Sequence, residues 1–409
     1  MYKVVQIQLS NKSAGSCALR LHVGLSESKI VESRGVSLFE DHIQSSGIKY
    51  LGKFPQIVAL TNNWIERKKR SYDSSKFGLY SYPVIGTDVS KLSTIVEADA
   101  IYIHWVQLGF FDFASFEKLF KLDKKLFVVM HDMWFMTGGC HYAVGCNLYE
   151  EGCQACPIFP NDTSIASSQH ALKQKLISQY GSNLEFITPS LWLKNLALKS
   201  SLLKDQKIHF IPNYFNSPHF KVESQSEARK LLSIDSTKLV VSFGAVNITS
   251  IYKGWKFLKK AFVHLKEMYS YDQLEVVIFG NGDLIEFQNS IDFKIHYLGY
   301  LEDEEKIALA YKVSDVFVIP SILDNQPTTV VESLHCGIPV VGFNLCGIPE
   351  MIQHKETGYI AKAYDSMDLA LGIQYCLKNN LKAKPKNEYL AKNVINSHFN
   401  LMNLDRSTG

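Results

Sequence analysis

The chain has 409 residues, 46% of them hydrophobic and 12% aromatic, which suits two or more domains with sizeable cores. A formal net charge of +3 is too small to indicate a nucleic-acid-binding protein. No run approaches the roughly 18 apolar residues of a membrane-spanning helix, and the start lacks a signal-peptide pattern. We therefore expect a cytoplasmic protein whose eight cysteines are thiols or metal ligands rather than disulfides.

The first half begins with the alternation of strands and helices that is typical of an α/β domain. Val4–Leu9 reads as a strand, and a polar turn with Gly15 leads into helical apolar spacing at 17–24. Such a turn can bring backbone amides close to a ligand, but one glycine also fits an ordinary turn. Further on, Trp64–Tyr72 is a basic cluster with aromatic flanks. It is typical of a solvated helix face or of a membrane-surface contact.

His131 stands at a position where α/β domains hold ligands. Strand-like runs occupy 100–105 and 125–130, and His131 with Asp132 follows the second run directly. The carboxyl end of a parallel strand faces the ligand crevice, so this histidine could contact a reacting group at neutral pH. A structural hydrogen-bonding role is the alternative, and both interpretations stay open.

Four cysteines follow within 17 residues, with the spacing C-x5-C-x6-C-x2-C: Cys140, Cys146, Cys153 and Cys156. In a reduced protein such a cluster can hold a structural zinc ion. Only the last pair has the usual zinc-knuckle spacing, however, and the first gap is long. We favour thiols that pack a long loop over a zinc site.

The chain is expected to divide near residue 208. The stretch 208–218 is rich in Pro and Asn and fits an inter-domain connection. We predict domains at 1–207 and 208–385. The segment 386–409 has helical apolar spacing, and we expect this helix to pack back on the first domain.

The second half restarts the strand–helix alternation and carries the sharpest signals. Lys253 lies between a strand at 239–243 and a helix, where it is well placed to neutralise a phosphate, although it could also be a surface lysine. A later strand–loop–helix unit places Asp324 on the loop and Glu332 on the helix. Helix-start amides suit a phosphate and carboxylates accept hydrogen bonds from hydroxyls, so the combination suits a nucleotide sugar.

Several pieces of the second half together resemble the retaining glycosyltransferases of family 4. These pieces are Lys253-Gly254, Gly280-Asn-Gly-Asp283, Asp324-Asn-Gln-Pro-Thr-Thr-Val-Val-Glu332, Cys336-Gly-Ile-Pro-Val-Val341 and Gly347-Ile-Pro-Glu350. In the first half, His131-Asp-Met-Trp134 and Thr137-Gly-Gly-Cys140 with the later cysteines resemble members that act in colanic-acid-like and other exopolysaccharide pathways.

The resemblance implies an α/β protein of the GT-B fold, with two facing Rossmann-like domains and a catalytic cleft between them. It implies a metal-independent transferase that uses a UDP- or GDP-linked sugar and a saccharide or lipid-linked acceptor in bacterial surface polysaccharide synthesis. No cofactor is expected. Such a protein would be cytoplasmic, with a possible peripheral contact with the inner membrane.

The resemblance also implies a role for each matching residue. Glu332 would hold the ribose hydroxyls of the donor, and Asp324 those of the donor sugar. Lys253 would hold the diphosphate, and His131 would lie by the anomeric carbon. The other predicted substrate-binding residues, which include a cleft-lining glycine and the backbone that meets the base, are Gly15, Asn247, Asn281, Tyr297, Leu298, Asn325, Gln326, Pro327 and Thr328.

Two departures from the family pattern bear on donor binding. The first acid of the motif is Asp324 rather than Glu, so its reach is shorter by one methylene. The family often has an Arg before the Lys, whereas this region reads Ala245-Val-Asn247-Ile-Thr249. Asn247 can face the phosphate but supplies no charge. The missing Arg leaves a second hypothesis, a non-catalytic nucleotide-sugar-binding subunit of a glycosyltransferase complex.

Overall fold

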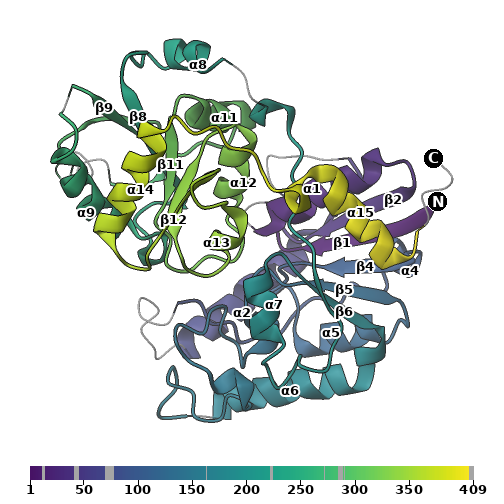
Figure 1. Ribbon diagram of the computed structural model, residues 1–409. Helices are drawn as coiled ribbons and strands as arrows, with labels where there is room; N and C mark the ends of the chain where they lie inside the picture. Colours follow the sequence, from purple (N-terminus) through teal and green to yellow (C-terminus); the bar gives the residue numbers. More distant parts are fainter. Residues whose placement is uncertain are drawn as a thin grey trace. The chain divides into compact units, whose positions relative to one another are not determined.

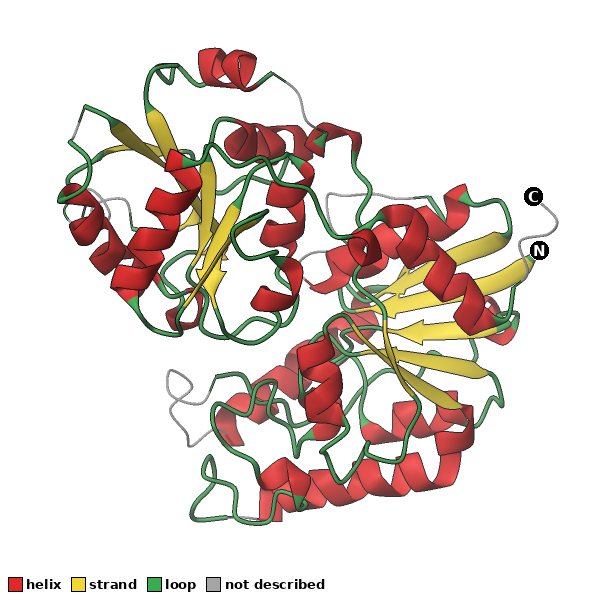
Figure 2. Cartoon of the chain, viewed as in Figure 1, coloured by secondary structure: helices red, strands yellow, loops and turns green. Residues whose placement is uncertain are grey.

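The computed structural model describes residues 1–11, 14–40, 46–69, 78–162, 164–221, 224–270, 272–283, 289 and 291–404. The chain divides into two compact units, Met1–Asn216 with Ala391–Gly409, and Ser217–Leu390. Residues 208–216 thus belong to the first unit, and 386–390 to the second. In each unit helices cover a sheet (Figure 2), and all strand pairs are parallel. The predicted class, α/β with two Rossmann-like domains, is confirmed.

The sheet of unit 1 has the strand order β3-β2-β1-β4-β5-β6-β7. Its strands are β1 (Tyr2–Gln8), β2 (Val31–Ser37), β3 (Ile48–Tyr50), β4 (Ala100–Ile103), β5 (Lys125–Val129), β6 (Leu184–Thr188) and β7 (Ile208–Phe210). The order reverses between β1 and β4, and such a switch point is where open α/β sheets bind ligands. The expected connection at 208–218 therefore starts with an edge strand, because its first three residues pair with β6.

Helices cover both faces of this sheet. They are α1 (Ala14–Glu27), α2 (Lys53–Lys69), α4 (Ser93–Val96), α5 (Phe113–Phe120), α6 (Ser164–Tyr180), α7 (Leu191–Ala197) and α15 (Ala391–Met402), with 3-10 turns η1 (Trp134–Met136), η2 (Leu148–Glu150) and η3 (Gly181–Asn183). In Figure 1, α1 and α15 lie on one face of the sheet, and α5 and α6 on the other. The two faces differ because successive strand residues point to opposite sides, so Val4 packs toward α1 and Val5 toward the other core.

The helix α15 is an integral part of unit 1, although unit 2 precedes it in the chain. Val394 and Phe399 belong to the apolar cluster that α1 and β4 also form. His398 is 3% exposed, and its Nδ1 lies 3.2 Å from the hydroxyl of Tyr102 in β4. Lys125 at the start of β5 donates to the carbonyl oxygen of Leu401 at 2.7 Å.

Unit 2 has the strand order β10-β9-β8-β11-β12-β13. The strands are β8 (Leu239–Asn247), β9 (Leu274–Asn281), β10 (Lys294–Tyr297), β11 (Val316–Ile319), β12 (Val340–Phe343) and β13 (Gly358–Ala361). The helices are α8 (Gln225–Leu231), α9 (Trp255–Lys266), α11 (Glu304–Lys312), α12 (Thr328–His335), α13 (Ile348–Met351) and α14 (Ser366–Lys378), with 3-10 turns η4 (Pro218–Phe220), η5 (Ile251–Lys253) and η6 (Asn387–Tyr389). Figure 1 shows the sheet between α9 with α14 and α11 with α12.

The order of unit 2 reverses between β8 and β11, which places its switch point between the two loops that the sequence singles out. Among the described residues, no helix is both long enough and apolar enough to cross a bilayer.

Candidate active site

The switch point of unit 2 brings Lys253 and Asp324 together. Lys253 ends the turn η5 after β8, and Asp324 lies in the loop after β11. Lys253 Nζ lies 2.6 Å from Asp324 Oδ2, and the two side chains are 33% and 14% exposed. The carboxylate thus holds the ammonium group at the edge of the sheet where ligands bind. An arriving phosphate would compete with Asp324 for this ammonium group.

A close backbone approach fixes Lys253 in this position. Gly254 has a φ of +70°, and a Cβ there would lie 1.8 Å from the carbonyl oxygen of Pro320, so the residue has to be glycine. The N–H of Ile322 donates to the carbonyl oxygen of Tyr252 at 2.8 Å. The loops after β8 and β11 are therefore joined through their backbones, on both sides of the Lys253–Asp324 pair.

The loop after Asp324 leads into the start of α12. Asn325 and Gln326 are buried, Pro327 is the N-cap residue in extended conformation, and Thr328 is the first helical residue. Helix α12 begins at the proline because the helix start needs no N–H there. The carbonyl oxygen of Asp324 accepts a hydrogen bond from the N–H of Gly347 at 3.2 Å. The N-terminus of α12 thus lies next in the chain to the acidic loop, and a helix N-terminus can accept an anion.

Glu332 lies in the second turn of α12 and is 7% exposed. Its Oε2 accepts a hydrogen bond from the hydroxyl of Tyr311 in α11 at 3.0 Å. This bond fixes the carboxylate, and it is a contact that sequence reasoning missed. Nothing in the sequence around Tyr311 marks it, because the contact joins two residues that are 21 positions apart on different helices.

The other predicted donor contacts of unit 2 lie at the carboxyl ends of β8, β9 and β10. Asn247 ends β8, and its Oδ1 accepts from the N–H of Thr249 at 3.1 Å. Asn281 ends β9. Tyr297 ends β10 and donates its hydroxyl to the carbonyl oxygen of Gly280 at 2.8 Å. The N–H of Leu298, the next residue, donates to Ile278 at 2.9 Å. Parallel strands place these residues on the same edge as Lys253 and Asp324.

In unit 1, His131 follows β5 and belongs to a chain of hydrogen bonds at the switch point. Its Nε2 lies 3.1 Å from Nδ1 of His104, which follows β4, and the two rings stack with centroids 5.4 Å apart. His104 Nε2 lies 2.7 Å from Oε1 of Gln6 in β1. Gly15 lies in the first turn of α1, which follows β1.

Both imidazoles in this chain are neutral at physiological pH. Burial lowers the pKa of His131 to about 4, against the smaller opposite effect of Asp132. Burial, followed by His131 and His398, holds the pKa of His104 well below its ordinary value. A neutral ring carries one N–H, so the Gln6 amide selects the tautomers. The Gln6 carbonyl oxygen accepts from His104 Nε2, so the proton of His104 lies on that nitrogen and its Nδ1 is an acceptor. His131 therefore carries its proton on Nε2 and donates it to His104 Nδ1.

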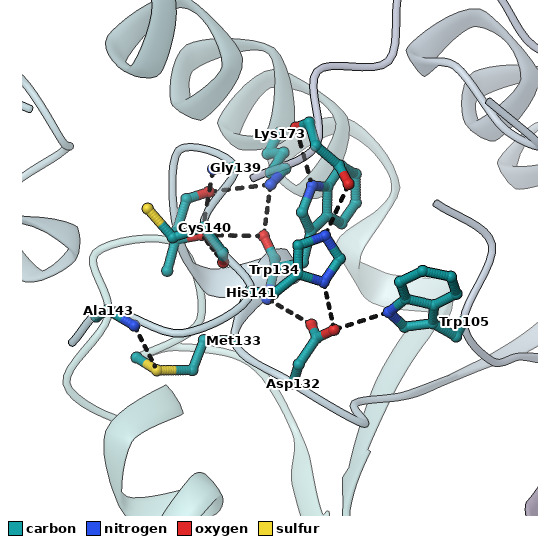
Figure 3. Close-up of polar contacts among 11 residues, drawn as sticks. Trp105, Asp132, Met133, Trp134, Gly139, Cys140, His141, Ala143 and Lys173 are labelled. Atoms are coloured by element: carbon teal, nitrogen blue, oxygen red, sulfur yellow. Dashed lines mark hydrogen bonds and ion pairs between the residues drawn. The ribbon is translucent and has the colours of Figure 1, made fainter. Parts of the chain in front are cut away.

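Asp132 anchors the loop through hydrogen bonds to His141, Trp105 and Trp134 (Figure 3). Its Oδ2 accepts from His141 Nδ1 at 2.5 Å and from Trp105 Nε1 at 2.8 Å, and its Oδ1 accepts from the N–H of Trp134 at 2.8 Å. Burial raises the pKa of Asp132, but His141 and the N–H donors outweigh burial and the net shift is downward. A permanently ionised anchor therefore fixes the backbone next to His131.

One group of side chains is hydrogen-bonded in the acid–histidine–serine order that is found in serine hydrolases, and it consists of Asp132, His141 and Ser81. Ser81 Oγ lies 2.7 Å from His141 Nε2. Ser81 is only 1% exposed, however, so its hydroxyl has no access to a substrate. We interpret the three residues as a structural cluster.

The four clustered cysteines of the loop after η1 are free thiols. Within the part of the chain that the structure describes, no three His, Cys, Asp or Glu side chains form a ready-made metal site.

Comparison with known proteins finds a family model that matches part of the second half of the chain. Residues 224–396 match the family model described as glycosyl transferases group 1. A relative from Campylobacter jejuni, named N,N'-diacetylbacillosaminyl-diphospho-undecaprenol alpha-1,3-N-acetylgalactosaminyltransferase, is 28% identical over 231 residues. That match covers 53% of this chain and 55% of the relative. The chain spans less than two thirds of the length of the curated relatives it matches.

Solved structures share the fold over almost the whole chain. Sucrose-phosphate synthase from Thermosynechococcus elongatus has a TM-score of 0.63 at 14% identity and covers 98% of both chains. The Anabaena protein HepE, solved with UDP-glucose, has a TM-score of 0.59 at 15% identity and covers 98% of this chain and 95% of its own. The chain therefore matches the group 1 glycosyl transferases over residues 224–396 and shares its two Rossmann-like α/β domains with solved GT-B glycosyltransferases.

Proposed function

We propose that the protein is a retaining glycosyltransferase of family 4, which moves a sugar from a UDP- or GDP-linked donor to a saccharide or lipid-linked acceptor. The observation that carries the proposal is the ion pair between Lys253 and Asp324 at the switch point of unit 2, with Nζ and Oδ2 2.6 Å apart. Asp324 lies shortly before the start of α12 in the chain. The family match covers these residues. The names of the Anabaena and Campylobacter proteins support a nucleotide-sugar donor and a lipid-linked acceptor.

Donor binding would rearrange the ion pair. A diphosphate carries more negative charge than one carboxylate, so it would draw Lys253 Nζ away from Asp324. Asp324 would then be available to accept hydrogen bonds from the donor sugar. Glu332, held by Tyr311, would receive the ribose hydroxyls. The shorter Asp324 side chain makes this residue the first candidate for donor preference.

The reaction needs charge stabilisation at the leaving group. The bond between the anomeric carbon and the diphosphate oxygen breaks, and the developing charge collects on phosphate oxygens. Lys253 and the N–H groups at the start of α12 would stabilise that charge, so we expect no requirement for a divalent ion. His131 would face the anomeric carbon as a neutral imidazole. The acceptor hydroxyl would attack on the face that the diphosphate leaves, so that its oxygen forms the new bond to the anomeric carbon and its proton passes to an oxygen of the leaving diphosphate.

The function is tested with the purified chain and a panel of UDP-, GDP-, ADP- and CMP-sugars. We expect one class of donor to raise the thermal unfolding temperature, with roughly 2.7 kcal/mol of added stability at a ligand concentration near 100 times Kd. The same donor should be hydrolysed slowly or transferred, and Glu332→Gln should abolish turnover. A donor that binds but is neither hydrolysed nor transferred with any acceptor would favour the non-catalytic subunit instead.

We also infer that α2 contacts the surface of an anionic membrane. Its outward face is apolar rather than polar, because Phe54, Ile57, Leu60 and Trp64 are 76%, 57%, 60% and 57% exposed. These residues recur every three or four positions, so they form one stripe along the helix. Exposed cations extend the stripe: Lys53, Arg67 and Lys68. Residues 70–72 of the basic cluster lie outside the described residues.

The α2 stripe combines the two features of a helix that lies in a membrane interface, exposed apolar side chains and adjoining cations. Replacing Phe54 and Trp64 together with Ser should lower the fraction of protein that sediments with phosphatidylglycerol vesicles by about tenfold, whereas neutral phosphatidylcholine vesicles should bind little of either protein. The matched control is Val263→Ser, an exposed apolar residue of α9. Equal sedimentation of all three proteins would refute the contact.

A further inference from the structure

The long loop after η1 gathers four thiols around one cavity. Cys140, Cys146, Cys153 and Cys156 all line it, together with apolar residues such as Leu148 and Ile158. The cavity has a volume of about 40 Å³, which exceeds the ~10–15 Å³ that a single water needs. The sequence spacing alone did not predict that all four cysteines line one cavity, because only the last pair lies close in the chain.

Backbone N–H groups point at two of the sulfurs. Gly138 N–H donates to Cys153 Sγ at 3.2 Å, and the N–H groups of Ile158 and Phe159 donate to Cys156. A Cβ at Gly138 would lie 2.5 Å from the carbonyl oxygen of Ala166, so this close approach needs glycine. Burial raises the pKa of the Cys153 and Cys156 thiols, and these hydrogen bonds act in the opposite direction. Such bonds are the usual second layer around a metal thiolate.

A buried cation adjoins the same thiols. Lys173 in α6 is 3% exposed. Its ammonium group donates to the carbonyl oxygens of Trp134 and Thr137 and lies 3.5 Å from the centroid of the Trp134 ring. Cys153 and Cys140 are among the groups that interact electrostatically with this ammonium group, so it lies near both thiols. Lys173 would thus offset part of the negative charge of a metal tetrathiolate.

The loop backbone is also held in costly conformations. Val144 has a φ of +40° and Cys153 a φ of +58°, values that a residue with a side chain rarely adopts. Each such residue costs of order 1–3 kcal/mol and persists only where the surroundings hold it. No long helix or strand supplies that support between 138 and 163, where the only regular element among the described residues is η2.

We propose that Cys140, Cys146, Cys153 and Cys156 bind one Zn²⁺ ion as a structural tetrathiolate site. Binding converts four Cys–SH groups and Zn²⁺ into Zn(S–Cys)4 with release of four protons, and no electron is transferred. As the side chains stand, no group of three or more His, Cys, Asp or Glu among the described residues could hold a metal ion, so binding requires the four cysteine side chains to turn inward. Cys146, half-buried at the outer part of the loop, has the most freedom to do so.

The ion would fasten the loop that begins at the active-site histidine. The cysteine loop follows Asp132 and contains His141, and the hydrogen bond between these two residues anchors the backbone next to His131. The proposal does not depend on the proposed function, because a structural ion would be present whether or not the chain transfers sugar.

The test is the metal content of the untagged full chain, purified under reducing conditions from zinc-supplemented cells. We expect one zinc per chain by mass spectrometry of metals. After removal of zinc, Co²⁺ should produce the intense sulfur-to-cobalt absorption of a tetrahedral thiolate site. Metal uptake should release protons and protect the four thiols from a thiol reagent.

Cys153→Ser should lower the zinc content at least tenfold, whereas Cys376→Ala, at a buried thiol of α14, should leave one zinc in place. If Cys153→Ser does not fold, the cobalt spectrum and proton release of the unsubstituted protein still decide the question. Protein without bound zinc that gives no thiolate spectrum with Co²⁺ would overturn the proposal. So would disulfides among the four cysteines in the protein isolated under reducing conditions.

Discussion

Lys253→Met should lower kcat/KM for sugar transfer by about 10²–10³-fold. In the proposed reaction Lys253 supplies the positive side chain that meets the leaving diphosphate, and removing one preorganised donor to a developing charge typically has an effect of this size. The substitution also leaves Asp324, which is 14% exposed, without its ion-pair partner at 2.6 Å. That carboxylate would then repel the diphosphate, so nucleoside diphosphate affinity should fall as well.

The double variant Lys253→Met with Asp324→Asn separates these two effects. It removes the unpaired carboxylate, so nucleoside diphosphate affinity measured by calorimetry should recover in part while turnover stays low. Lys260→Met is the control, because Lys260 is an exposed lysine of α9, the helix that follows Lys253. Unchanged turnover and affinity in Lys253→Met would show that Lys253 is only a surface lysine.

Unit 1 should lose stability steeply in acid. Burial lowers the pKa of His398 to about 3, against about 6.5 for an unfolded histidine. Between pH 6.5 and 3 the unfolded chain therefore binds a proton that the folded chain does not. Stability is fully present above pH 6.5 and is lost as the pH falls, by about 4 kcal/mol at the lower limit. His131 and His104 have lowered pKa values too and act in the same direction.

The contribution of His398 is measured by urea unfolding at several pH values. His398→Gln keeps a hydrogen-bond partner for the Tyr102 hydroxyl but does not titrate. Between pH 6 and 4 the slope of the unfolding free energy against pH should therefore become smaller, by an amount equivalent to the uptake of up to one proton on unfolding. His219→Gln, at an exposed residue of η4, should leave the slope unchanged. Equal slopes in the two variants would show that His398 is not buried as a neutral ring.

Local patterns in the sequence were enough to predict the two α/β domains and the unit around Asp324. The apolar run of β11, Pro327 and Gly337 are signals within a few residues of one another, and periodicity with turn chemistry reports such features. The edge strand β7 was missed because its three residues adjoin a Pro/Asn-rich stretch. The outward apolar face of α2 was missed because periodicity shows a stripe but not the direction in which it points.

Contacts between distant residues could not be predicted from one sequence. The Gln6–His104–His131 chain joins three strands, and its outer members are 125 residues apart in the sequence. Asp132 adjoins His131 in the chain, but its hydrogen bonds go to His141, Trp105 and Trp134, which the sequence does not mark as its partners. Such partners are set by how the strands align in the sheet.

The discontinuous composition of unit 1 has a consequence for the order of folding during synthesis. Unit 2, from Ser217 to Leu390, is one continuous stretch and leaves the ribosome before Ala391–Met402. Until then the Tyr102 hydroxyl lacks His398, and the apolar face that α15 covers has no cover. Most of unit 1 is therefore synthesised first, but unit 1 reaches its final packing only after unit 2 is complete and able to fold. During that interval nascent unit 1 exposes an apolar surface on which chaperones can act.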